Sequence, residues 1–209
     1  MHFNILKPLR TFILIVPILF IGCEQFSSET DYNSLSYKED FRLAKVEDRY
    51  QMYLPKFMKS TNDLNEDASL QFKNELKETY TILIDETNEE AKAALQMLGS
   101  YKDSISMLEN YIDFQKENLT QDVEVISLKE PLRKRIDGMP AMTFETTIAF
   151  EEIIYPVSYH VTVVEAKESL FMIMSWTLKS RKKKYFPYFE KASNSLEVFK
   201  ARESEVFLD

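Results

Sequence analysis

The sequence contains 209 residues, with 34 acidic side chains against 26 lysines and arginines and a formal net charge of −8 at pH 7. Nucleic-acid phosphates are bound by clustered cations, so this acidic excess argues against nucleic acid as a partner. The single cysteine excludes an intramolecular disulfide, so the folded part must be stabilised by its core. The length fits one folded domain behind an N-terminal segment.

The first 22 residues have the parts of a secretory signal peptide. Lys7 and Arg10 precede an almost wholly apolar stretch, residues 11–22, and no acidic residue comes before it. A helix needs about 20 apolar residues to span a bilayer, and Pro17 interrupts this shorter stretch. We therefore expect residues 1–22 to be a signal peptide that is removed, and we do not expect a membrane span.

The only cysteine, Cys23, follows Gly22 at the end of the apolar stretch. This arrangement resembles the lipobox of bacterial lipoproteins, in which a small residue precedes an invariant cysteine. The resemblance implies that the Cys23 thiol is alkylated with diacylglycerol, that the chain is cut before it, and that the new amine is acylated. Several acyl chains give stable membrane binding where one gives only marginal binding. We therefore expect a membrane-anchored lipoprotein of the cell envelope, periplasmic or surface-facing.

Residues 23–38 are polar, rich in serine and acidic side chains, and show no apolar periodicity. Such a composition is typical of a flexible segment, because it offers too little apolar surface to bury. The sequence thus predicts a lipidated tether over 23–38 and one folded domain over 39–209.

Three strands are predicted first, over residues 49–55, 69–76 and 78–85, because apolar and polar residues alternate there. The pattern then changes to steps of three and four, which predicts a helical insert over about 88–121. Thr87 and Glu90 have the spacing of a capping box at its start. Gly99 is expected to divide the insert into two helices, because glycine is unfavourable inside a helix.

The period of two returns after this insert. Residues 122–128 and 131–137 are predicted as short or edge strands, followed by a turn at Gly138 and Pro140. Residues 141–152 alternate and predict a half-exposed strand. Residues 157–166 and 169–178 are apolar on both faces and predict central strands. A final helix is predicted over 182–200, with Tyr185 and Phe189 in the core and Phe186 and Tyr188 left as a surface apolar site.

These elements predict an α+β fold, an antiparallel β-sheet with helices packed on its faces. The turn Gly138-Met139-Pro140-Ala141, Trp176 at the end of the last long strand, and Ser195-Leu196 in the closing segment resemble the C-terminal half of the PsbP/Mog1-like fold. The chain is similar in kind to bacterial lipoproteins of the DcrB and LpqN types. The resemblance implies a PsbP/Mog1-like sandwich that acts as an assembly or interaction module.

Residues suited to catalysis are scarce. After removal of the signal peptide only His160 could act as an imidazole base, and Gly99 and Gly138 are too few for a glycine-rich phosphate loop. The chain offers no free cysteine to bind a soft metal ion, because its only cysteine, Cys23, is expected to carry lipid. Carboxylates on neighbouring strands, Glu145 among them, can approach each other, but an acidic chain produces such neighbours by chance. We therefore expect no enzyme activity, no cofactor and no metal site.

Two basic stretches interrupt the acidic sequence, and both are expected near strand ends, where they could join into one docking patch for an acidic partner or for lipid head groups. An alternative is a solvated helix start together with an edge strand that is guarded by cations. The residues of this predicted docking patch are Lys129, Arg133, Lys134, Arg135, Lys179, Arg181, Lys182, Lys183 and Lys184.

Two functions of different classes remain after these exclusions. The first is a lipid-anchored, non-catalytic accessory protein that binds or helps to assemble another envelope protein. The second is a carrier or chaperone that shelters an apolar ligand, a lipid or a hydrophobic segment, between the sheet and the helices. Methionines such as Met142 and Met172 would suit an adaptable lining for such a ligand.

Overall fold

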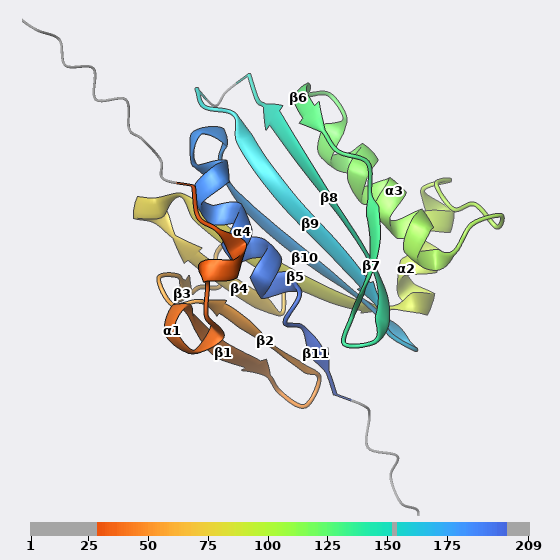
Figure 1. The fold of residues 1–209 in the computed structure, drawn as a ribbon. Helices are drawn as coiled ribbons and strands as arrows, with labels where there is room; N and C mark the ends of the chain where they lie inside the picture. The colour runs from red at the N-terminus through yellow and green to blue at the C-terminus, as the bar shows by residue number, and fades with distance from the viewer. Residues whose placement is uncertain (1–28, 152–153, 200–209) are drawn as a thin grey trace, which may run out of the picture.

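The computed structural model describes residues 29–151 and 154–199, and its main feature is a pair of antiparallel sheets with helices on them (Figure 1). The large sheet has eight strands in the order β3-β4-β5-β10-β9-β8-β6, with β7 also paired to β8. The small sheet has the order β1-β2-β11. The predicted α+β fold with an antiparallel sheet and packed helices is thus confirmed.

The strands are β1 (Phe41–Val46), β2 (Tyr50–Pro55), β3 (Lys59–Ser60), β4 (Leu70–Asn74), β5 (Thr79–Thr87), β6 (Glu124–Leu128), β7 (Leu132–Ile136), β8 (Met139–Ala149), β9 (Val157–Glu165), β10 (Ser169–Leu178) and β11 (Glu197–Val198). The helices are α1 (Tyr37–Asp40), α2 (Asn88–Met97), α3 (Met107–Thr120) and α4 (Lys182–Ser193). Three short 3-10 turns complete the described part: η1 (Tyr32–Ser34), η2 (Glu75–Lys77) and η3 (Lys179–Arg181).

Both faces of the large sheet are covered, because alternate residues of its central strands enter two separate cores. On one face Val164 and Ile173 pack with residues of the small sheet and with the C-terminal end of α4. On the other face Val163 and Met172 pack with α2 and α3. Figure 1 shows α4 lying across one side of the large sheet and α2 and α3 on the other. The two-sided apolar pattern of β9 and β10 therefore indicated their central position correctly.

The helical insert is divided as predicted. Thr87 and Glu90 form the capping box at the start of α2, and Gly99, with a φ of +70°, follows the end of that helix. A second capping box, formed by Ser106 and Glu109, starts α3. Satisfying the free N–H groups of a first turn in this way stabilises a helix. The Ser106 box is visible in the sequence and places the start of α3 several residues beyond Gly99.

Helix α4 ends at Ser193, earlier than predicted. Ser195 donates a hydrogen bond to the Ala192 carbonyl at 2.6 Å and accepts one from the Tyr53 N–H of β2 at 2.8 Å. This link turns the chain toward the small sheet, where β11 pairs with β2. Leu196 is buried, and it packs from this turn and not from a helix.

The prediction that Phe186 is a surface apolar residue is wrong. Phe186 is buried, with its ring edge-on to His160 at a centroid distance of 5.9 Å. The half-exposed assignment of the strand around 141–152 also needs correction, because Ala141 and Thr147 are buried on the face that was expected to be polar. The sequence pattern cannot reveal this burial, since α4 reaches that face from a distant part of the chain.

The predicted tether is in part folded. Residues 23–28, including Cys23, lie outside the described residues, but Leu35 is 6% exposed and belongs to the first core. The Tyr37 hydroxyl donates to the Lys191 carbonyl of α4 at 3.0 Å, and Asn194 donates to the Tyr32 hydroxyl at 3.3 Å. The folded domain therefore begins before residue 39, and it also includes strand β1, which the alternation did not predict.

Candidate docking site

The two basic stretches meet at one carboxylate, Glu145 of β8. The ammonium nitrogens of Lys129 and Lys182 each lie 2.9 Å from Glu145 Oε2. Lys129 follows β6, and its backbone N–H also donates to the Glu145 carbonyl at 2.9 Å, while Lys182 is the first residue of α4. Glu145 therefore connects the edge of the sheet to the start of the helix that crosses it.

Glu145 is held in its charged form. Burial raises the pKa of Glu145, but the contacts with Lys129 and Lys182 outweigh burial and leave the pKa below its ordinary value. The negative charge of Glu145 consequently neutralises part of the positive charge of Lys129 and Lys182. The exposed part belongs mainly to Lys129, whose side chain is 66% exposed.

His160 of β9 is the cross-strand partner of Glu145. Burial, together with the positive charge of Lys134, lowers the pKa of His160 to about 4, although the Glu145 charge acts in the opposite direction. His160 is thus neutral at ordinary pH, and its Nδ1 atom has no hydrogen-bond partner in the described part of the chain. A general base needs access to its substrate, so this buried imidazole is not placed for acid–base chemistry.

Hydroxyl side chains line the sheet beside His160. Thr147 and Ser158 hydrogen-bond across β8 and β9 at 2.8 Å, and Thr81 and Ser175 do so across β5 and β10 at 2.9 Å. All four are buried. This half of the face near α4 is therefore polar, unlike the apolar half that packs on the small sheet. Serines and threonines at alternate strand positions are the sequence signal of this layer, and it was not predicted.

The cations of β7 do not form one surface. Arg133 pairs with Glu109 of α3, whereas Lys134 donates to Asn194 Oδ1 beside α4 at 2.8 Å. Lys134 is half-buried, and this burial lowers its pKa. Arg135 donates to the Gly138 carbonyl at 2.6 Å, in the turn that follows β7. Successive side chains of a strand point to opposite faces, so the run of three cations is divided.

The second stretch is only partly free. Arg181 donates to the Leu76 carbonyl at 3.0 Å, and the Lys184 ammonium lies 5.6 Å from the centre of the Tyr185 ring. Lys179 is exposed, and Lys183 is exposed with Glu29 as a distant ion partner at 3.9 Å. Fewer of the cations in the predicted docking patch are therefore free to contact a partner than the sequence suggested. The two stretches meet only through Lys129 and Lys182 at Glu145, and Lys179 and Lys183 are the exposed lysines next to Lys182 along the chain. We call these four lysines the Glu145 cluster surface.

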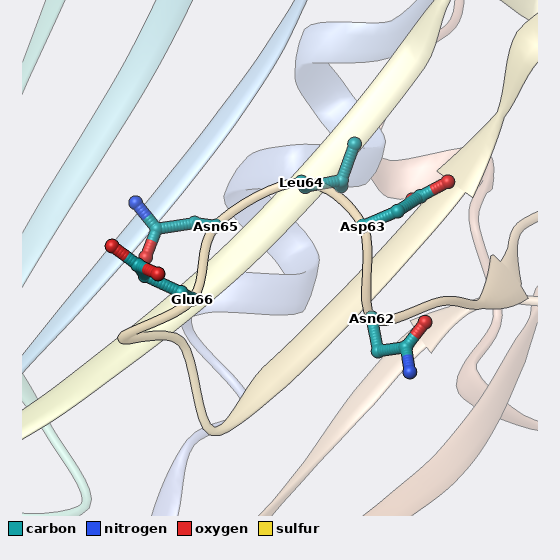
Figure 2. A pocket seen from close by; sticks show the side chains of 5 residues that line it. All are labelled: Asn62, Asp63, Leu64, Asn65 and Glu66. Atoms are coloured by element: carbon teal, nitrogen blue, oxygen red, sulfur yellow. The ribbon is translucent and has the colours of Figure 1, made fainter.

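Over residues 29–151 and 154–199, no group of three or more histidine, cysteine, aspartate or glutamate side chains is arranged to hold a metal ion. A depression of about 440 Å³ lies in the connection between β3 and β4 and is lined by Asn62, Asp63, Leu64, Asn65 and Glu66 (Figure 2). Its lining is mostly polar, which does not suit an apolar ligand.

Within the described residues, every helix is too short or too polar to pass through a bilayer.

The domain has two antiparallel sheets, with α4 on the face of the large sheet that meets the small sheet and α2 and α3 on the opposite face. This α+β arrangement defines the class of protein. The PsbP family model matches residues 42–198, which is most of the described part, and the chain belongs to the PsbP family. The predicted resemblance to the PsbP/Mog1-like fold is thereby confirmed.

Solved structures of the same fold include LpqN, a Mycobacterium tuberculosis protein involved in cell envelope biogenesis. Its identity to this chain is 6%, the TM-score is 0.51, and the match covers 72% of this chain and 83% of LpqN. The cyanobacterial PsbP protein CyanoP from Synechocystis is 14% identical with a TM-score of 0.49, over 77% of this chain and 93% of CyanoP. Among curated proteins, no sequence matches this chain significantly.

Proposed function

We propose that this protein is a lipid-anchored, non-catalytic accessory protein of the bacterial cell envelope that binds another envelope protein. The observation that carries the proposal is the order of two features in one chain. A lipobox-like stretch ends at Cys23, and a PsbP-family domain matches residues 42–198. The role of LpqN in cell envelope biogenesis supports the same location for this chain.

Protein binding, as opposed to catalysis, is supported by the side chains available. The buried, neutral His160 and the absence of a metal-holding group in the described residues leave little chemistry for turnover. The Glu145 cluster surface offers exposed cations on an otherwise acidic protein. An acidic patch on another envelope protein is the partner that such a surface would attract.

The anchor is tested with Cys23→Ser in the full chain. We expect wild type to fractionate with membranes and to incorporate labelled fatty acid, and we expect the variant to do neither, because it lacks the thiol that receives the lipid. A variant that stays in the membrane fraction and carries lipid would contradict the anchor.

The docking surface is tested by crosslinking in membranes, followed by affinity capture. Lys179→Glu with Lys183→Glu reverses two exposed charges, and we expect the captured partner to decrease about tenfold or more because attraction becomes repulsion. Lys167→Glu is the matched control, since its side chain is 94% exposed in the turn between β9 and β10. Equal capture by all three proteins would remove this surface from the proposal.

The carrier alternative has less support, because both faces of the large sheet are filled by packed side chains and the described depression at 62–66 is mostly polar. Native mass spectrometry of the purified Cys23→Ser chain distinguishes the two functions. A co-purified lipid would favour the carrier, whereas the mass of the protein alone would favour the accessory role.

A further inference from the structure

Strand β6 is an edge strand that the fold leaves uncovered. Every residue from Glu124 to Leu128 is exposed, including Val125, Ile126 and Leu128. Its inner side pairs with β8, and no strand in the described part of the chain pairs with its outer side. Apolar side chains thus stand beside a row of free backbone donors and acceptors, which is a template for another strand.

The other sheet edges are very short or carry cations, and this includes β7, which borders the same side of β8 as β6 and contains Arg133, Lys134 and Arg135. Strand β3, at the opposite end of the large sheet, has two residues and includes Lys59. In the small sheet, β1 carries Arg42 and Lys45, and β11 has only two residues. Short length and edge cations are the usual protections against strand pairing. Strand β6 has five residues and none of them is a cation, although Lys129 follows it directly and a bulge interrupts it at Ile126.

The backbone of β6 presents its free groups at two residues. Lys129 N–H donates to Glu145, and the Ser127 carbonyl accepts from Thr146 Oγ1, so both residues face β8. Backbone groups alternate in direction along an antiparallel strand, so those of Leu128 point away from β8. Beyond the bulge at Ile126, Val125 lies opposite Ile148 of β8. Alternation along β8 makes this a pair without mutual hydrogen bonds, so the backbone N–H and C=O of Val125 also point away from β8.

We propose that β6 pairs with β6 of a second copy of this chain, antiparallel and about a two-fold axis between Ile126 and Ser127. In that register Val125 of each copy lies opposite Leu128 of the other. The outward backbone groups therefore meet each other, and two apolar side chains are placed together. The two-fold axis places Ile126 of each copy opposite Ser127 of the other, so the two bulges lie side by side.

The charges select the same register. Glu124 of each copy lies opposite Lys129 of the other, which gives two cross-strand pairs of opposite sign. Lys129 already contacts Glu145, and an ammonium group has three donors, so a second carboxylate can be accepted. A shift by one residue toward the C-terminus places Glu124 opposite Glu130, which is repulsive. In the proposed register, with Glu124 opposite Lys129, the large sheets of the two copies form one continuous sheet.

Charge exchange tests the proposal in full-length chains by sedimentation equilibrium in a density-matched detergent. Wild type is expected to dimerise, and Glu124→Lys or Lys129→Glu alone is expected to weaken self-association by about tenfold or more, because like charges face each other twice. An equimolar mixture of the two variants is expected to regain the wild-type affinity. A monomeric wild type, or a mixture no tighter than its components, would overturn the proposal.

Disulfide trapping provides a second measurement that spares the contact between Lys129 and Glu145. Val125→Cys and Leu128→Cys are made separately in the Cys23→Ser chain. Opposed residues in a hydrogen-bonded pair have Cα atoms about 5.5 Å apart, which a disulfide can span. We expect a crosslink when the two variants are mixed and none in either alone. A crosslink that forms equally well in one variant alone would contradict the register.

Discussion

Glu145 and His160 are neighbours on adjacent strands, and the protein shifts the pKa of both downward for different reasons. Two ammonium groups at 2.9 Å lower the pKa of Glu145 by favouring its charge, whereas burial lowers the pKa of His160 by opposing its charge. Both shifts link stability to pH in the same direction, because each folded-state pKa lies below the unfolded one.

Replacing Glu145 with glutamine removes the charge between Lys129 and Lys182 and leaves the two ammonium groups facing each other. We expect a loss of about 1–3 kcal/mol in the free energy of unfolding, measured by urea denaturation at neutral pH. Glu130→Gln is the matched control, because its side chain is 84% exposed where it pairs with Lys116, and we expect about 0.5 kcal/mol or less there. Equal losses would show that the cluster does not stabilise the fold.

The His160 imidazole makes stability depend on pH in a defined window. The ordinary pKa of 6.5 falls to about 4 in the folded protein, so the unfolded chain takes up the proton first as the pH falls. Lys134 on β7, Glu145 on β8 and Lys182 on α4 are the charged groups around it. The stability that His160 contributes is complete above about pH 6.5 and lost toward pH 4, by up to about 3 kcal/mol.

Urea denaturation of wild type and His160→Gln near pH 7 and pH 5 measures this linkage. Glutamine does not titrate, so wild type is expected to lose about 1–2 kcal/mol relative to the variant between these pH values. A difference between the two proteins that stays constant with pH would contradict the assignment.

At the scale of elements, the sequence is most informative where a local rule is sufficient. Thr87 and Glu90 cap α2, and Gly99 ends the first half of the insert, as local spacing predicts. The end of α4 is different, because Ser195 of the chain after the helix bonds to Tyr53 in a strand about 140 residues earlier. Helical periodicity continued past Ser193, but the long-range bond decides where the helix stops.

The Ser106 capping box is the clearest test at this scale. Ser106→Ala removes the acceptor of the Glu109 N–H at 3.2 Å and the donor to the Glu109 side chain. We expect the free energy of unfolding to fall by about 1 kcal/mol. The exposed Ser104, in the loop before α3, provides the control, and Ser104→Ala is expected to change stability by less than about 0.5 kcal/mol. Similar effects of both substitutions would rule out a special role for the cap.

At the scale of the whole molecule, the two sheets, α4 and the N-terminal segment enclose one core. Leu35 contributes to that core from a stretch whose composition is typical of a flexible tether. The acidic and serine-rich neighbours dominate the local pattern, and a single leucine among them gives no periodic signal. Only the position of α4 reveals the apolar site into which Leu35 packs.

Leu35→Ala tests whether this segment belongs to the folded unit. Removal of a buried leucine side chain is expected to cost about 2–4 kcal/mol of unfolding free energy, measured by urea denaturation. Leu76→Ala removes the same atoms from a residue that is 92% exposed, and we expect less than about 0.5 kcal/mol. If both variants were as stable as wild type, residues 29–38 would not be part of the fold.

Sequence alone was sufficient for the class of fold, the central strands β9 and β10 and the divided helical insert, because alternation, capping and glycine placement act over a few residues. It also contains the Cys23 signal on which the anchor proposal rests. The edge position of β6 was also predicted from its sequence, whereas tertiary structure decided that Glu145 joins two distant basic stretches, that Phe186 is buried, and that no other segment of the described chain covers the outer side of β6. Those outcomes depend on which segments, distant in the sequence, come to cover each face and edge, and local periodicity contains no information about distant partners.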